Sequence, residues 1–103
     1  MPKPLRTFTN ENSVKLAVKK LLDQYQIFHW AASAGAFTIA GVPDRFAIVR
    51  GRCIGLEVKA PGKKPTPLQL EFGRRMQRSG ALWFLIDGDE ALSHLKQELE
   101  AML

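Results

Sequence analysis

Two strand-like runs that flank Arg50-Gly51-Arg52 constrain the fold of this chain more than any other feature. Residues 45–49 and 53–59 are rich in β-branched, aromatic and other apolar side chains, which favour strands. Gly51 lies between the two runs and suits the left-handed backbone of a tight turn. The pattern therefore predicts an antiparallel β-hairpin, around which the rest of a sheet must be built.

Two of the possible hairpin registers bring Asp44, Glu57 and Lys59 to one face. With a two-residue loop at Arg50-Gly51, Asp44 lies opposite Glu57, whereas a loop at Gly51-Arg52 places Asp44 opposite Lys59. The three side chains share a face in both registers, because side chains alternate along a strand with a period of two. A three-residue loop without a bulge would place Asp44 on the other face.

The pairing of Asp44 with Glu57 is unfavourable unless something lies between them. Two carboxylates opposite each other on paired strands are about 5 Å apart and repel. Mg²⁺ removes the repulsion, because it prefers oxygen ligands from one or two carboxylates with water and phosphate. A Glu-x-Lys sequence alone is common on solvated strands, but Pro43-Asp44 at the matching position favours a metal site. Asp44 and Glu57 are the candidate ligands, with Lys59 beside them.

Length, composition and charge limit the class of protein. A chain of 103 residues with 46% hydrophobic residues predicts one domain over residues 1–103. No long apolar run or signal-peptide core is present, and Cys53 has no cysteine to pair with. We therefore expect a cytoplasmic protein with no membrane partner.

The net charge of +5 favours an anionic partner. Lys63 and Lys64 follow the second hairpin strand, and Arg50 and Arg52 flank the turn. These four cations are candidates for contacts with the phosphates of DNA. The alternative interpretation is a basic, solvated surface with no particular partner.

The periodicities along the chain predict the order helix, strand, strand, strand, helix, strand, helix. A helix is expected to begin at Thr9 or Asn10, and a strand is expected over residues 26–32. The two strands of the hairpin follow, and after them come a helix from Thr66, a strand over residues 81–86 and a helix from Asp87. The first three strands would form a meander, and the helix after Thr66 would cross over to a fourth, parallel strand. The expected fold is an α/β layer sandwich with a mixed β-sheet flanked by helices. Residues 1–8 are expected to form a loose basic arm.

With these features in place, the sequence resembles the stand-alone VRR-NUC domain of phages and bacteria, within the PD-(D/E)XK nuclease superfamily. The residues that carry the resemblance are Gly41-Val42-Pro43-Asp44, residues 54–62 with Glu57-Val58-Lys59, Gln69, Glu11 and the loop 33–37. Arg45 departs from the pattern, because the resemblance implies an apolar residue directly after Pro-Asp. The implied fold is the restriction-endonuclease-like αβββαβα sandwich.

The resemblance implies a divalent-metal-dependent DNA endonuclease that acts as a homodimer on branched DNA such as four-way junctions. No small-molecule cofactor is implied. Asp44, Glu57 and the backbone carbonyl of Val58 would hold Mg²⁺ or Mn²⁺. Lys59 would orient the attacking water and stabilise charge near the phosphate.

Three further residues receive roles from the resemblance. Glu11 would reach the site from the first helix, through water or a second metal ion, although an acid in a first helical turn is also favoured by the helix dipole. Gln69 would orient Lys59 or contact DNA, and it also fits a capping box with Thr66. Ser33 would contact DNA.

Two other functions are compatible with the sequence. A non-catalytic DNA-binding module could keep the nuclease fold as a scaffold, although such a module usually loses one of Asp44, Glu57 and Lys59. An RNA nuclease is also possible, but the sequence offers no platform for stacking single-stranded bases.

Overall fold

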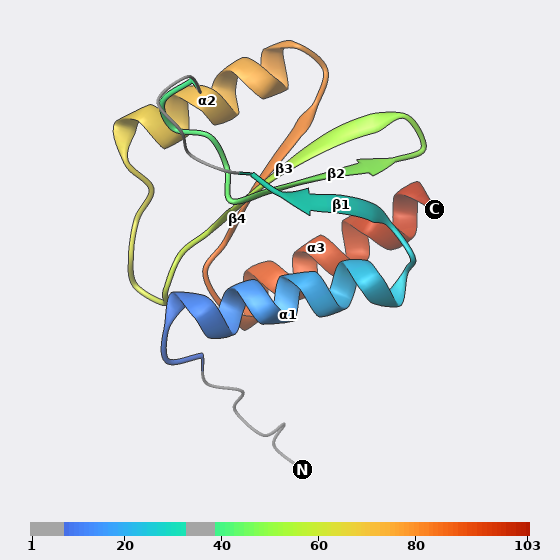
Figure 1. The fold of residues 1–103 in the computed structure, drawn as a ribbon, viewed down its shortest axis with the longest axis horizontal. Helices are drawn as coiled ribbons and strands as arrows, with labels where there is room; N and C mark the ends of the chain where they lie inside the picture. Colours follow the sequence, from blue (N-terminus) through green and yellow to red (C-terminus); the bar gives the residue numbers. More distant parts are fainter. Residues whose placement is uncertain (1–7, 33–38) are drawn as a thin grey trace.

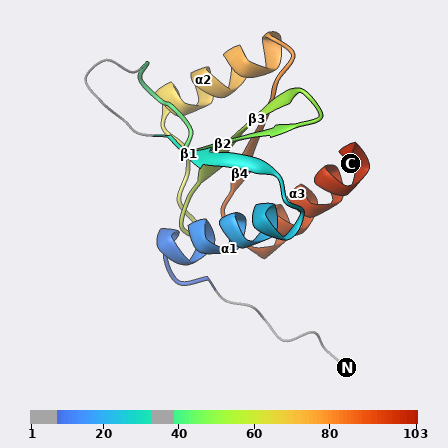
Figure 2. The same cartoon turned by 45° about the vertical axis from the view of Figure 1, so that its right-hand side comes forward.

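The computed structural model describes residues 8–32 and 39–103. Its elements are α1 (Glu11–Gln24), β1 (Phe28–Ala31), β2 (Arg45–Val49), β3 (Arg52–Val58), α2 (Pro67–Arg78), β4 (Leu82–Ile86) and α3 (Asp89–Met102). The strands form one sheet in the order β1-β2-β3-β4, with α1 and α3 on one face and α2 on the other (Figures 1 and 2). The predicted αβββαβα layer sandwich is confirmed.

The β2–β3 hairpin adopts the first of the registers considered above. Val49 pairs with Arg52, so the turn is the two-residue loop Arg50-Gly51, whose φ angles are 49° and 81°. Positive φ at both positions matches the right-handed twist of the flanking strands. Continuing the register beyond β2 places Asp44 opposite Glu57.

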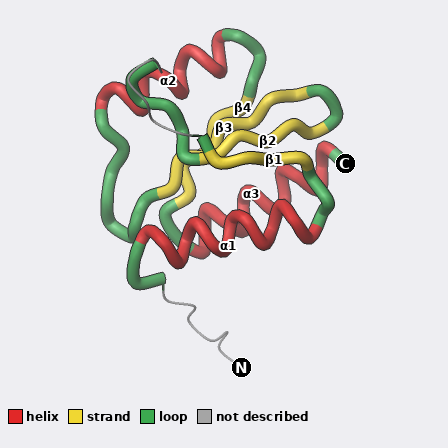
Figure 3. Tube along the Cα trace, viewed as in Figure 1, coloured by secondary structure: helices red, strands yellow, loops and turns green. Residues whose placement is uncertain are grey.

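The remaining sheet connections follow the prediction, and β1 is shorter than expected. β1 pairs with β2 in antiparallel fashion, whereas β3 pairs with β4 in parallel after the α2 crossover, as the trace in Figure 3 shows. β1 does not begin at residue 26, because Gln26 has a φ of 55° and the Ile27 N–H donates to the Leu22 carbonyl at 3.1 Å. The turn that ends α1 therefore uses both residues.

The two ends of the chain differ in detail from the prediction. Phe8 is half-buried against the apolar core, so the expected arm does not extend to it, and residues 1–7 lie outside the described part. The N-cap of α3 is Gly88, which makes no side-chain capping bond, so the capping pattern expected from Asp87 is not formed. No helix in the described ranges 8–32 and 39–103 has the length and apolar character needed to cross a membrane.

The two faces of β3 pack against different partners. Ile54, Leu56 and Val58 are buried in the core that α1 and α3 complete. On the opposite face, a Cβ added at Gly55 would lie 2.6 Å from the sulfur of Met76, so glycine lets α2 approach closely. The face that packs against α2 therefore has little side-chain bulk on β3 before Glu57.

Candidate functional site

Asp44 is held between the ends of two strands. Its Oδ2 accepts a hydrogen bond from the Val58 N–H at 2.7 Å, and its carbonyl accepts one from the Ala32 N–H at 2.9 Å. Its second carboxylate oxygen, Oδ1, lies 3.5 Å from Lys15 Nζ. The backbone of β3 thus fixes this carboxylate at the end of the sheet.

Glu57 is the one polar or charged side chain that is buried among residues 8–32 and 39–103, with 2% of its surface exposed. Its Oε1 is buried and has no hydrogen-bond partner. Burial, followed by the hydrogen bond and the charge of the neighbouring Asp44 carboxylate, raises the pKa of Glu57 to about 8, while Lys59 acts in the opposite direction. A carboxyl that is both buried and repelled in this way is costly to ionise without a cation nearby.

The donor set at this point fits a divalent cation. The unpartnered Oε1 of Glu57 and the fixed carboxylate of Asp44 are oxygen ligands of the kind that Mg²⁺ prefers. Across residues 8–32 and 39–103, no three His, Cys, Asp or Glu side chains converge to form a metal cage by themselves. A cation here would therefore need backbone, water or phosphate oxygens as well.

Lys59 directly follows β3 and stays within reach of the carboxylates. Its N–H donates to the Ile86 carbonyl at 3.0 Å, which continues the pairing with β4 by one residue. Its side chain is half-buried, and its ammonium group lowers the pKa of Glu57. The structure thus brings the Asp44, Glu57 and Lys59 side chains together, as the period of two predicts.

Lys15 was missed by the sequence argument. Its Nζ lies 3.1 Å from Glu11 Oε2 and 3.5 Å from Asp44 Oδ1. Burial opposes the charge of Lys15, but these two carboxylates raise its pKa above the usual value. The only signal in the sequence was the spacing of four residues from Glu11, which reveals the helical ion pair but not the contact with Asp44.

Glu11 therefore approaches the site through Lys15. Its side chain is 42% exposed, and its charge contributes to the raised pKa of Glu57. Gln69 has the capping role instead: Oε1 accepts from the Thr66 N–H at 2.9 Å, and its own N–H donates to Thr66 Oγ1 at 3.2 Å. No hydrogen bond between Gln69 and Lys59 is present among the described residues.

The predicted DNA-contacting residues lie at different distances from the carboxylates. Lys63 and Lys64 are exposed in the loop that follows Lys59. Arg50 and Arg52 lie at the hairpin turn, at the opposite end of the strands, and Arg52 Nε donates to the Gly80 carbonyl at 3.1 Å. Ser33 lies outside the described residues.

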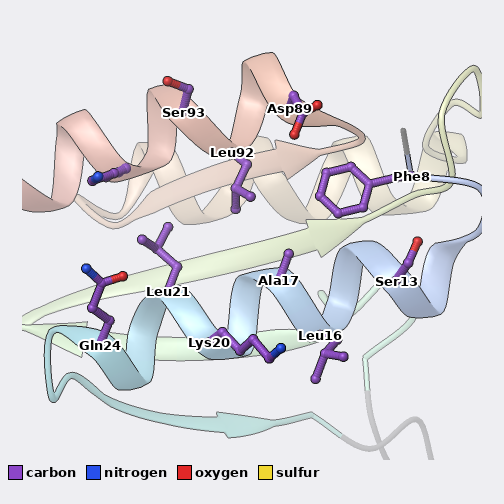
Figure 4. A pocket seen from close by; sticks show the side chains of 11 residues that line it. Phe8, Ser13, Leu16, Ala17, Lys20, Leu21, Gln24, Asp89, Leu92 and Ser93 are labelled. Carbon is purple, nitrogen blue, oxygen red and sulfur yellow. The ribbon is translucent and has the colours of Figure 1, made fainter. Parts of the chain in front are cut away.

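Two hollows in the described part of the chain bear on the position of the site. The smaller has a volume of about 160 Å³ and is lined by Lys15, Val18, Ala31, Ala32, Asp44, Arg45 and Val58. The larger, of about 700 Å³, lies between α1 and α3, and Figure 4 shows Ala17, Leu21 and Leu92 around it. Only the smaller hollow is lined by candidate metal-ligating residues, Asp44 and Val58, so it is the one that belongs to the candidate site.

Comparison with known proteins agrees with this architecture. No family profile matches the chain. A solved structure described as a VRR_NUC domain superposes with a TM-score of 0.74 at 25% identity, over 87% of this chain and 97% of that structure. The chain has the VRR-NUC fold. The resemblance predicted from the sequence is confirmed.

A phage protein provides a second comparison for this VRR-NUC-like chain. The "Putative nuclease p44" of Acyrthosiphon pisum secondary endosymbiont phage 1 is 43% identical over 56 residues. The matched segment covers 53% of this chain and 60% of that protein. The chain thus matches somewhat more than half the length of this relative.

Proposed function

We propose that this chain is a divalent-metal-dependent DNA endonuclease that hydrolyses phosphodiester bonds. The observation that carries the proposal is the buried Glu57 carboxyl, whose Oε1 has no partner, beside a fixed Asp44. The VRR-NUC fold and the name of the phage relative support the same class of reaction. We take residues 1–103 as one nuclease domain that acts in the cytoplasm of a bacterial or phage-infected cell.

Asp44, Glu57 and the Val58 carbonyl would hold Mg²⁺, with Mn²⁺ as a substitute. When bound, the cation would polarise the scissile phosphate, lower the pKa of a water and offset charge on the leaving oxygen. The Val58 N–H holds the Asp44 carboxylate in place for this role. Glu57 would hold the cation as the ionised carboxylate, so binding of the cation would favour release of the Glu57 proton.

The other site residues would act around these ligands. Lys59 would orient the attacking water and stabilise charge near the phosphate. Glu11 would act through water and through Lys15, which joins it to Asp44. Gln69 would fix the start of α2 through its capping bonds to Thr66 and would also contact DNA.

DNA would approach the site along the basic loop. Lys63 and Lys64 are exposed and lie four and five residues after Lys59, so they would contact phosphates near the cleaved bond. Arg50 and Arg52 would contact only a substrate that also extends to the hairpin turn. Ser33 would also contact DNA.

We further propose a homodimer that cleaves branched DNA, including four-way junctions. One site nicks one strand, whereas symmetric cleavage needs two sites related by a two-fold axis. β1 is an outermost strand, and Phe28, Trp30 and Ile48 on β1 and β2 are 69%, 40% and 40% exposed. This apolar surface supports pairing with a second copy. Sedimentation should give a dimer that Trp30→Lys converts to a monomer, and a monomeric wild type would contradict the proposal.

The test of the nuclease proposal is cleavage of a labelled substrate panel with Mg²⁺, Mn²⁺ or EDTA. The panel contains duplex, single-stranded, flapped and four-way-junction DNA, together with an RNA duplex, and Glu57→Ala is the control variant. Metal-dependent cutting of DNA by the wild type alone is expected. Tight binding of DNA without cutting under any metal would instead support the non-catalytic module.

A further inference from the structure

A second polar cluster, formed by Asp23, His29 and Arg45, lies on the face of the sheet that α1 covers. Arg45 Nη1 is 2.7 Å from His29 Nδ1, and His29 Nε2 is 2.6 Å from Asp23 Oδ1. The proposed reaction uses none of these three residues. Arg45 also occupies the position where the resemblance implied an apolar residue, so neither the family pattern nor the proposed reaction accounts for it.

The direction of the hydrogen bonds in the cluster follows from the chemistry of arginine. A guanidinium can only donate, so His29 Nδ1 must accept from Arg45. The other ring nitrogen, Nε2, then carries the hydrogen and donates to Asp23. His29 is 8% exposed, and its hydrogen bond lowers the pKa of Asp23. The cluster therefore holds one corner of the guanidinium in a fixed orientation.

Arg45 also lines a cavity that includes a second cationic residue. Arg45 and Lys15 both line the 160 Å³ cavity, and they share it with Asp44. The other walls are the small or apolar Val18, Ala31, Ala32 and Val58. Within the described residues, the guanidinium makes no hydrogen bond other than the one to His29, so four of its five N–H donors are available.

We propose that this cavity binds a DNA phosphate adjacent to the cleaved bond and that Arg45 contacts it, with His29 and Asp23 as positioning residues. The proposal rests on the proposed function, because it takes the ligand to be the nucleic-acid backbone. Phosphate suits the site because a guanidinium can bind two of its oxygens with two parallel N–H donors. Asp44 would repel a lone anion, so the phosphate is expected to bind together with a divalent cation.

The test uses the full chain with Ca²⁺ and a four-way junction that carries one methylphosphonate at successive positions around the branch. Affinity is measured by fluorescence anisotropy, and intact DNA is verified on a gel. In the wild type, neutralising one position should weaken binding about tenfold, the effect of losing a charge-assisted hydrogen bond. In Arg45→Leu, the same neutralisation should have no further effect.

A matched control is Arg75→Leu, which removes the same charge from an exposed position on α2. This variant should keep the wild-type sensitivity at every position. The proposal would be overturned if Arg45→Leu kept that sensitivity too, or if no single position mattered in the wild type. If Arg45→Leu fails to fold, Arg45→Lys replaces it: one ammonium cannot bind two oxygens in parallel, so weaker binding at that phosphate is expected and unchanged binding contradicts the proposal.

The positioning role of His29 has its own readout. His29→Gln can still accept a hydrogen bond from Arg45 and should keep the methylphosphonate effect, whereas His29→Leu should reduce it. Equal effects in both variants, with only their thermal stability altered, would assign His29 a purely structural role. The assay measures DNA binding without cleavage, so it tests the phosphate site separately from the nuclease activity. If Arg45→Leu abolishes the methylphosphonate effect but the protein never cuts DNA, the nuclease proposal is rejected and the phosphate site is kept.

Discussion

On one face of β3, Ile54, Leu56 and Val58 are buried against apolar side chains of α1 and α3, whereas on the other face Gly55 is followed by the buried Glu57. The first face stabilises the fold, because each buried aliphatic side chain contributes about 1.5–3 kcal/mol. The second face buries a carboxyl oxygen that has no partner, which costs stability. Packing of the core therefore explains the first set of residues, whereas it does not account for the buried, unpartnered Oε1 of Glu57.

The largest effect should come from removing the ligand oxygen while keeping the shape of the side chain. Glu57→Gln should lower the cleavage rate by about 10³-fold or more, since loss of preorganised charge stabilisation at a reacting centre has effects of this size. The fold should remain intact, because the amide is neutral. Cleavage assays with a thermal melt measure both, and normal cutting by this variant would refute the role of Glu57.

The matching change on the opposite face of β3 should lower stability and leave cleavage nearly unchanged. Leu56→Ala removes a side chain that is 0% exposed and should lower the free energy of unfolding by about 3 kcal/mol. Cleavage per folded molecule should stay within about twofold of the wild type, because the side chain points away from the carboxylates. Denaturant unfolding gives the stability, and a loss below about 1 kcal/mol would show that this face is not the core.

The pH dependence of stability separates the two faces without changing the packing. In EDTA, Glu57 has a pKa of about 8 in the folded chain against an ordinary value of 4.5. Between these values the folded state binds more protons than the unfolded state, so stability falls as the pH rises, by at most about 1.4 kcal/mol per pH unit. The stability that the protonated Glu57 carboxyl contributes is fully present below pH 4.5 and is lost above pH 8.

Glu57→Gln is the control for this titration. Its stability should lack the downward slope, so that the variant gains on the wild type as the pH approaches 8. Parallel stability curves for the two proteins over this range would show that Glu57 ionises freely in the folded chain.

The smallest effect is expected at the exposed loop. Lys63→Ala should reduce the slope of log affinity for DNA against log salt by about 0.9, the value for one phosphate contact, and leave stability within about 0.5 kcal/mol. Lys96→Ala, on the exposed side of α3, is the matched control and should leave the slope unchanged. Equal slopes for Lys63→Ala and the wild type would remove this loop from the DNA interface.

The sequence predicts the parts of this molecule that depend on local rules. The hairpin turn follows from Gly51, and the grouping of Asp44, Glu57 and Lys59 follows from side-chain alternation in the correct register. The capping box of Gln69 is equally local, since it needs only Thr66 three residues earlier.

Contacts between elements that are distant in sequence could not be predicted in the same way. Lys15 reaches Asp44 only because α1 packs across the end of the sheet, and Arg45 meets His29 only through the β1–β2 register. The loss of a side-chain cap at α3 depends on Gly88 rather than Asp87 taking the N-cap position. Helix packing decides the contact of Lys15 and strand register decides that of Arg45, and neither contact has a signature within a short stretch of sequence.

The most direct test of the central claim is a calorimetric titration of Mg²⁺ and Mn²⁺ into the chain at pH 7, in two buffers with different ionisation enthalpies. Because the pKa of Glu57 is about 8, cation binding should release close to one proton per site. Glu57→Gln should bind the cation at least about tenfold more weakly and release no proton. Binding that is equally tight in the variant, or that releases no proton in the wild type, would contradict the account.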